Sequence, residues 1–243
     1  MQVWGLTDPG CVRAQNQDAL RIEQLDRRCY LCVVCDGMGG AKSGNVASSL
    51  AIDVFVQEVR RARKSGMSTQ QVGQMLRSAV KLANFTVYDQ AQQFEAFSGM
   101  GTTLVAAYVE DRRAVIVNVG DSRAYLMNAE GVQCITTDHS LVQLMVQRGE
   151  LTQEQAKRFP GKNFITRAIG TEAIVECDLF DAELEKGDFL LLCSDGLSNL
   201  LDDQELLFEV VHGVNKELCC RRLIDIAKTR GAPDNVTCIL AAI

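Results

Sequence analysis

Short apolar runs recur along the chain, and each is bounded by Gly, Asp or Asn. They are rich in Val, Ile, Leu and Cys and lie near residues 29–35, 103–109, 113–119, 123–127, 163–169, 188–193 and 235–242. Runs of this length and composition predict buried β-strands. The turns at 110–112 and 129–131 are so short that the strands they join are expected to pair antiparallel.

Apolar positions spaced by three and four residues predict two helices between the first two of these strands. One stripe runs from Val46 to Phe55 and the other from Val72 to Ala83, which gives each helix an apolar face. Further helices are predicted near 140–148, 203–211 and 216–229, and Gly149 is placed to end the first of these. Because the helices come in blocks, the pattern favours α+β layers over an alternating parallel α/β fold.

Composition and charge narrow the class of protein. The chain has 243 residues, 47% of them hydrophobic, and no linker, repeat or low-complexity tract divides it. We therefore expect one domain over residues 1–243, acting as a monomer. The net charge of −6 argues against nucleic acid as a partner. No apolar run could span a bilayer and the N-terminus lacks a signal-peptide layout, so we expect a cytoplasmic protein with no membrane partner.

Two local patterns favour ordinary structural roles over chemistry. In a strand over 29–35, Cys32 faces away from Cys29 and Cys35, which lie about 20 Å apart, so these thiols cannot share a metal ion. We interpret the ten cysteines as buried small hydrophobes in a reducing compartment. The basic run from Arg60 to Lys64 is interpreted as the solvated end of a helix, where it complements the helix dipole.

The apolar run Val33-Val34-Cys35 ends on Asp36, which is followed by a cluster of glycines. Nucleotide-binding spacings do not fit, because G-x-x-x-x-G-K-[ST] would need glycine at positions 36 and 41, and the dinucleotide pattern would need one at 42. A carboxylate with room around it suits a hard cation such as Mg²⁺ or Mn²⁺. A single Asp-Gly pair is, however, more often a plain turn.

The same pattern recurs elsewhere in the chain. Asp121 and Asp195 also follow apolar runs, and Asp234 comes just before the last one. A sheet can bring such side chains to one edge, so four aspartates at strand ends predict a site. Carboxylates that close together repel one another unless cations neutralise them.

Eight segments in this order resemble the motifs of the metal-dependent type 2C protein phosphatases of the small bacterial single-domain type. They are Arg13 with Asn16-Gln17-Asp18, Asp36 to Gly40, Gly99 to Thr103, Val119 to Arg123, Asp138 to Ser140, Thr166 to Gly170, Ser194 to Leu197 and Asp234 to Thr237. The resemblance covers essentially the whole chain. It implies two antiparallel β-sheets packed face to face, flanked by helices on both outer faces.

The resemblance also implies a metal centre of two Mn²⁺ or Mg²⁺ ions, with a place for a third. By resemblance, Asp36 bridges both ions, Gly37 offers its carbonyl, Asp195 and Asp234 ligate one ion, Asp18 holds waters on the other, and Asp121 with Asp195 matches the third site. Two ions about 3.5 to 4 Å apart lower the pKa of a shared water, and the resulting hydroxide can attack phosphorus. Arg13 is then a planar fork for phosphate oxygens.

The implied activity is hydrolysis of phosphoserine and phosphothreonine in phosphorylated proteins, with a cognate Ser/Thr kinase as the natural partner. Two alternatives are a non-catalytic module that binds phosphoproteins and a two-metal nuclease, which the acidic charge disfavours. The segment 138–161 is expected to form a flap beside the cleft. His139 and His212, the two histidines, are interpreted as structural or solvated.

Two residues depart from the family pattern. Many members carry histidine after the Gly-Gly pair, where this chain has Ala41. The proton donor for the leaving group is therefore open, and a metal-bound water is the simplest substitute. Gln17 replaces the acidic residue often found beside the aspartate of its motif. Neither departure changes an expected metal ligand.

Overall fold

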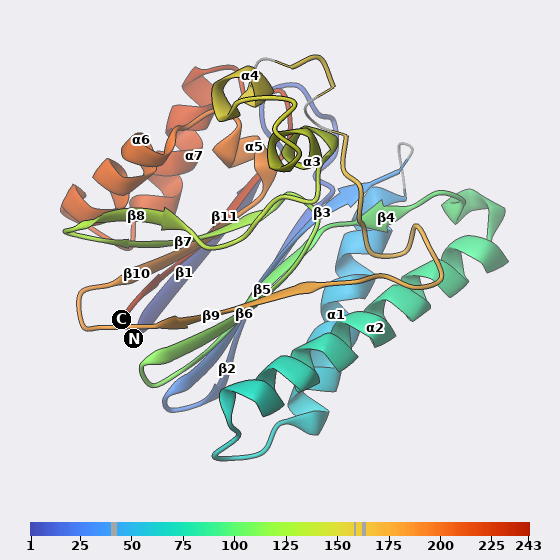
Figure 1. The fold of residues 1–243 in the computed structure, drawn as a ribbon, viewed down its shortest axis with the longest axis horizontal. Helices are drawn as coiled ribbons and strands as arrows, with labels where there is room; N and C mark the ends of the chain where they lie inside the picture. The colour runs from blue at the N-terminus through green and yellow to red at the C-terminus, as the bar shows by residue number, and fades with distance from the viewer. Residues whose placement is uncertain (40–42, 158, 162–163) are drawn as a thin grey trace.

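The computed structural model describes residues 1–39, 43–157, 159–161 and 164–243. Two antiparallel β-sheets lie face to face, and helices cover the outer face of each (Figure 1). The α+β sandwich predicted for this chain is confirmed.

The first sheet has an edge-to-edge order that departs from the order of its strands in the chain, whereas the second sheet keeps the chain order. The first sheet runs β1 (Gln2–Asp8), β11 (Val236–Ala242), β10 (Phe189–Cys193), β7 (Arg123–Asn128) and β8 (Gly131–Cys134). The second runs β2 (Asp18–Asp26), β3 (Cys29–Met38), β5 (Leu104–Glu110), β6 (Arg113–Val119) and β9 (Asp178–Glu183), and the short β4 (Gly101–Thr102) pairs with β3. The last strand thus lies between β1 and β10 in the interior of the first sheet.

The helices form two outer layers and a group at one end of the sandwich. α1 (Gly44–Ala62) and α2 (Thr69–Gln93) cover the second sheet, and the turn η1 (Glu95–Phe97) follows them. The first sheet is covered by α5 (Asp195–Ser198), α6 (Asp203–Leu207), η2 (Phe208–His212) and α7 (Cys219–Thr229). α3 (Leu141–Gln147) and α4 (Gln153–Lys157) lie at the upper end in Figure 1. In the described part of the chain, no helix combines the length and apolarity needed to cross a membrane.

Three apolar layers hold the sandwich together. One lies between the helices α1 and α2 and the second sheet, one between the two sheets, and one between the first sheet and α7. Cys29 and Cys35 belong to the first layer, whereas Cys32 lies between the sheets. The predicted alternation of these three thiols along the strand is confirmed, and so is their burial.

The strand predicted over 163–169 is wrong in its described part, 164–169. Ile165 forms an isolated bridge with Ser140, and Ile169 forms another with Thr102. Because its backbone groups are shared between two different segments, this stretch joins no ladder. Gly149 has φ +73° just after α3, which confirms its predicted role at the end of that helix.

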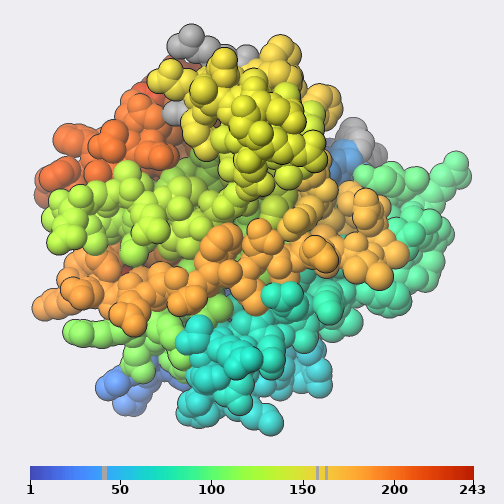
Figure 2. All heavy atoms as spheres, in the orientation of Figure 1, coloured from blue at the N-terminus to red at the C-terminus, as the bar shows by residue number. Residues whose placement is uncertain are grey.

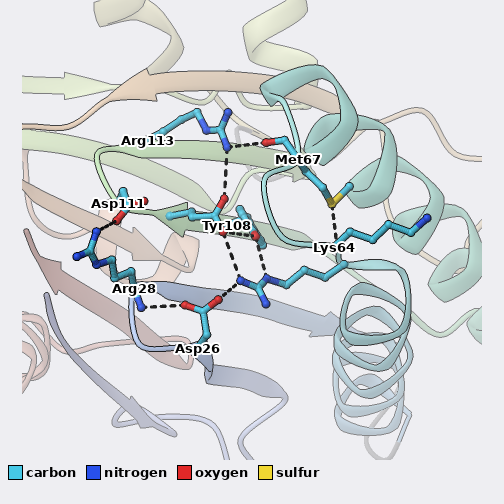
Figure 3. Close-up of polar contacts among 9 residues, drawn as sticks. Asp26, Arg28, Lys64, Met67, Tyr108, Asp111 and Arg113 are labelled. Carbon is cyan, nitrogen blue, oxygen red and sulfur yellow. Dashed lines mark hydrogen bonds and ion pairs between the residues drawn. The ribbon is translucent and has the colours of Figure 1, made fainter.

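The end of the sandwich near the hairpin β2–β3 carries a polar cluster that the sequence did not reveal (Figure 3). Arg63 follows the last residue of α1 and donates a 3.0 Å hydrogen bond to the Tyr108 hydroxyl. It also pairs with Asp26 and Glu110, and its side chain is only 17% exposed. The basic run is therefore not a uniformly solvated face, since Arg63 joins α1 to two hairpins.

Candidate active site

Four aspartates meet at one edge of the sandwich, each delivered by a strand end. Asp18 begins β2 and lies directly across from Asp36, near the end of β3. Asp121 follows β6, and Asp195 follows β10 as the first residue of α5. Burial raises the pKa of Asp36 most, and the charges of Asp18, Asp195 and Asp121 raise it further, which places the four carboxyl groups in one electrostatic cluster.

The backbone of Asp36 is held by two threonines of the neighbouring segment. Its N–H donates to Thr103 Oγ1 at 2.9 Å, and its carbonyl accepts from Thr103 N at 2.9 Å and Thr102 Oγ1 at 2.8 Å. Thr102 and Thr103 therefore orient the strand end that carries the carboxylate.

Asp18 is almost fully buried, with 8% of its surface exposed. Its Oδ2 accepts a 2.8 Å hydrogen bond from Ser194, whose hydroxyl accepts one of 3.0 Å from the backbone N–H of Thr237. The Oδ1 atom has no partner among the described residues. Burial, above all, raises the pKa of Asp18 to about 6. An unpartnered carboxylate oxygen is costly to bury, so this position favours a proton or a cation.

The pKa values of the other aspartates in the cluster are raised as well. Burial and the charge of Asp195 raise the pKa of Asp121 to about 8. Burial also raises the pKa values of Asp36 and Asp195, whose side chains lie within hydrogen-bonding distance of each other. Like charges at this separation take up protons unless a cation neutralises them. A set of carboxylate oxygens is the donor set preferred by Mg²⁺ and Mn²⁺.

The cluster is not a closed metal cage. Within the described ranges, no three Asp, Glu, His or Cys side chains are arranged to hold one ion together. Mg²⁺ usually keeps several waters and takes only one or two carboxylates from the protein. Paired carboxylates, together with the unpartnered Asp18 Oδ1, therefore fit hydrated ions of this type.

Gly37 occupies a position where no side chain fits. A carbon added at its Cβ position would lie 2.1 Å from the carbonyl oxygen of Gly44 and 2.5 Å from that of Gln17. Its N–H donates to the Gln17 carbonyl at 3.1 Å. The close approach of α1 to the end of β3 thus requires glycine here. Residues 40–42, including Ala41, lie outside the described residues.

Arg13 and Asp234 come from opposite ends of the chain and lie beside the cluster. Arg13 Nη2 donates a 2.8 Å hydrogen bond to Asp234 Oδ2, and both side chains are partly exposed. This bond, with smaller contributions from the charges of Asp36 and Asp195, raises the pKa of Arg13. The predicted phosphate ligand and the predicted metal ligand are thus ion-paired with each other.

Asn235 is a positioning residue, although the sequence identified it only as part of the segment Asp234 to Thr237. Its amide donates to the carbonyls of Pro9 and Gln15, both at 3.0 Å, and its Oδ1 accepts from Gln17 N at 2.8 Å. This side chain holds the loop that carries Arg13 against the start of β11. Because its partners lie more than 200 residues away, no local signal could have revealed this role.

A cavity of about 730 Å³ opens beside Asp121 and Asp195. One wall comes from the 138–161 segment, which stands at the top of the molecule in yellow in Figure 2, and the opposite wall comes from residues 198–205. Polar and charged residues line it, including Arg123, Asp138, Gln143, Asp202, Glu205 and Arg230. The cavity is large enough for several residues of a polypeptide adjoining the carboxylate cluster.

His139 is buried behind Asp121, whereas His212 is exposed on η2. The His139 ring lies between Gly120 and Asp178, and burial is the main cause that lowers its pKa. Its burial agrees with the interpretation of His139 as a structural residue. No local pattern in the sequence indicates that His139 contacts Gly120, the residue preceding Asp121.

Comparisons with known proteins agree with this geometry. Residues 12–223 match the family model of protein phosphatase 2C. The serine/threonine phosphatase stp of Listeria monocytogenes is 34% identical over 236 residues, covering 96% of this chain and 92% of the relative.

Two solved structures are similar over nearly the whole chain. The structure of serine/threonine phosphatase Stp1 from Staphylococcus aureus has a TM-score of 0.93 at 40% identity and covers 100% of this chain and 94% of its own. The catalytic domain of the serine/threonine protein phosphatase PstP, solved with two manganese ions, has a TM-score of 0.84 at 33% identity, covering 98% and 96%. With its sequence, its sandwich fold and its edge of strand-end aspartates all in agreement, this chain belongs to the protein phosphatase 2C family.

Proposed function

We propose that this chain is a metal-dependent phosphatase that hydrolyses phosphoserine and phosphothreonine in proteins. The observation that carries the proposal is the cluster of Asp18, Asp36, Asp121 and Asp195 at an open sheet edge, beside Arg13 and a cavity of about 730 Å³. Named relatives that match over more than nine-tenths of their own length are serine/threonine phosphatases, which supports the same activity.

The metal ligands proposed here are Asp18, Asp36, Gly37, Asp195 and Asp234, with Asp121 and Asp195 for a third ion. Mn²⁺ or Mg²⁺ fits the oxygen donors, and the two manganese ions of the PstP structure favour Mn²⁺. When bound, such a pair of ions supplies a nucleophilic water at neutral pH and neutralises charge that develops on the phosphate.

The chain's own residues position the reactants. Arg13 offers two parallel N–H groups to phosphate oxygens, and release from Asp234 frees its fork for the substrate. Ser194 fixes one oxygen of Asp18 and so leaves the other oriented for a ligand. Thr102 and Thr103 hold the end of β3, so that Asp36 keeps its position when charge changes around it.

The remaining expectations belong to the same proposal. Residues 1–243 form a single catalytic domain with a flap at 138–161, and the protein acts as a monomer on phosphorylated proteins of a partner Ser/Thr kinase. All cysteines of the described residues are free thiols, which supports a place in the reducing cytoplasm. The proton donor to the leaving oxygen stays open, because Ala41 stands where many relatives carry histidine.

A phosphopeptide assay with Mn²⁺, repeated in excess chelator, tests the function. We expect release of inorganic phosphate from phosphoserine and phosphothreonine peptides and its loss in chelator. Binding of the phosphopeptide without turnover would favour the alternative, a non-catalytic regulatory module of the same fold. The intact carboxylate cluster argues against that alternative, since a binding module needs no such concentration of acidic groups.

A further inference from the structure

His139 forms a hydrogen bond with each of the two backbone polar groups of the residue before Asp121. The N–H of Gly120 donates to His139 Nδ1 at 3.0 Å, and the N–H of His139 donates to the Gly120 carbonyl at 2.9 Å. Gly120 has φ +108°, and an added Cβ would lie 2.6 Å from the Thr103 side chain. The turn that presents Asp121 therefore has little freedom, and His139 supplies its reciprocal pair of hydrogen bonds.

The contacts of the ring fix its tautomer. Because Nδ1 accepts a hydrogen bond, the proton of the neutral imidazole lies on Nε2, which donates to Asp178 Oδ2 at 3.1 Å. Arg167 Nη1 lies 3.1 Å from Asp178 Oδ1 and 3.2 Å from His139 Nε2. Because Nε2 carries the proton in this tautomer, the guanidinium binds the carboxylate and does not donate to the ring. In metal sites, a carboxylate that accepts the second ring N–H of a histidine fixes its tautomer and orientation. Here Asp178 plays the same part for a histidine that binds a backbone amide.

The residues around His139 also connect the turn to the start of the 138–161 segment and to the chain that follows it. Asp138 accepts two hydrogen bonds from Arg123, two residues beyond Asp121, at 2.9 and 2.7 Å. The carbonyl of His139 accepts from Thr166 N at 2.7 Å. Asp138 and His139 thus bind the residues on either side of Asp121, Arg123 and Gly120, and Thr166, which follows the flap in the chain, is bonded to His139.

We propose that His139 is a positioning residue for the phosphatase reaction: in its Nε2–H tautomer, set by Asp178, it holds the Gly120–Asp121 turn and joins it to the base of the flap. This role rests on the proposed function. In this role, His139 controls the position of Asp121 although it binds neither phosphate nor the carboxylate cluster directly.

Two substitutions separate the roles of the two ring nitrogens. The side-chain oxygen in His139→Asn can replace Nδ1 as the acceptor for Gly120, whereas His139→Gln places its amide near Nε2 and leaves the Gly120 N–H without an acceptor. We expect His139→Gln to raise the Mn²⁺ concentration for half-maximal hydrolysis about tenfold, because a buried N–H that loses its acceptor costs about that factor or more. His139→Asn should stay within about threefold of wild type.

A readout independent of activity is the exchange rate of the Gly120 amide proton, measured by NMR in the Mg²⁺-loaded protein. We expect faster exchange in His139→Gln and near wild-type exchange in His139→Asn, with His212→Asn as the matched control at an exposed histidine. Equal Gly120 protection and equal metal requirement in the two variants would overturn the proposal. Failure of the wild type to hydrolyse phosphopeptides would instead overturn the proposed function, and the Gly120 measurement would still test whether His139 holds the Gly120–Asp121 turn.

Asp178→Ala provides a second test if His139→Gln does not fold. Asp178 is 42% exposed, so its loss removes the partner of Nε2 with little effect on packing. We expect faster Gly120 exchange and about a threefold higher metal requirement. An unchanged Gly120 amide in a folded Asp178→Ala protein would count against control of the tautomer by this carboxylate.

Discussion

Arg13 and Asp234 form a 2.8 Å ion pair that joins the loop after β1 to the start of β11, beside the carboxylate cluster. In the proposed function the two residues have different ligands, phosphate for Arg13 and a metal ion for Asp234. Their pairing indicates that ligands and ion pair compete for the same groups. Binding of a metal ion by Asp234 should therefore release the guanidinium of Arg13 for the phosphate of the substrate.

Arg13→Ala should lower kcat/KM for a phosphopeptide by about ten- to a hundredfold, which corresponds to the loss of a charge-assisted hydrogen bond to phosphate. Initial rates over a range of peptide concentrations give this value, and most of the loss should be in KM. Arg21→Ala is the matched control, because Arg21 forms a similar exposed pair with Asp53 at 2.7 Å. Equal losses in the two variants would contradict a phosphate-binding role.

Asp36→Asn should abolish turnover while leaving the fold intact. Removal of one negative charge from the cluster relieves repulsion in the metal-free protein, so its Tm in chelator should equal or exceed that of the wild type. Phosphate release and thermal unfolding measure the two effects. Activity within tenfold of wild type would rule out Asp36 as a ligand shared by two ions.

The metal-free protein should become more stable as pH falls from 8 to 7. The pKa of Asp121 rises from 3.8 to about 8 on folding, so the folded state binds a proton more readily than the unfolded state in this range. Stability rises with falling pH wherever the folded state binds more protons. Thermal unfolding in chelator at the two pH values tests this, and the rise should be smaller in Asp121→Asn. A Tm that falls over this interval would contradict the expectation.

Replacement of residues 151–157 by a Gly/Ser linker should change the preference among phosphoprotein substrates more than the hydrolysis of p-nitrophenyl phosphate. Gln153 and Ala156 of this segment line the cavity beside Asp121, where a polypeptide would lie but a small aryl phosphate would not reach. The ratio of kcat/KM for two phosphoproteins and the aryl phosphate measures the effect. Equal losses on all substrates would count against a flap.

Arg63→Lys should destabilise the protein without changing its activity. A lysine cannot reproduce the planar fork that binds Tyr108, Asp26 and Glu110 at once, so we expect a loss of about 1 to 3 kcal/mol in the free energy of unfolding. Denaturant unfolding measures it, with kcat/KM as the control on function. Arg61→Lys, at a side chain 75% exposed, should leave the free energy of unfolding close to that of the wild type.

The parts of the fold that could be predicted from the sequence are those where local pattern and burial agree. Interior strands such as β3 and β10 are continuous apolar runs, and an aspartate that ends such a run is visible as a candidate ligand. The strands that were missed, β1, β2, β8 and β9, all lie at sheet edges. Their exposed faces and irregular alternation resemble loops, because an edge strand buries less of its surface.

The positioning contacts of the site could not be predicted for a different reason. His139 takes its partners from residues 19 positions before it and 39 after it, and Asn235 takes its partners from the loop after β1. These contacts depend on how strands from distant parts of the chain are ordered in the sheets. Periodicity in the sequence carries no information about that order.

Because β11 lies in the interior of the first sheet, the active site cannot form before this strand has been synthesised. β1 and β10 are joined only through this strand, and the bond between Thr7 and Thr237 spans 230 residues. Contacts of such long range slow folding, since the chain must close a large loop before they form. On the ribosome, the first sheet would stay divided until Asp234 and, just after it, β11 have emerged. A partly synthesised chain would therefore be unable to remove phosphate from its neighbours.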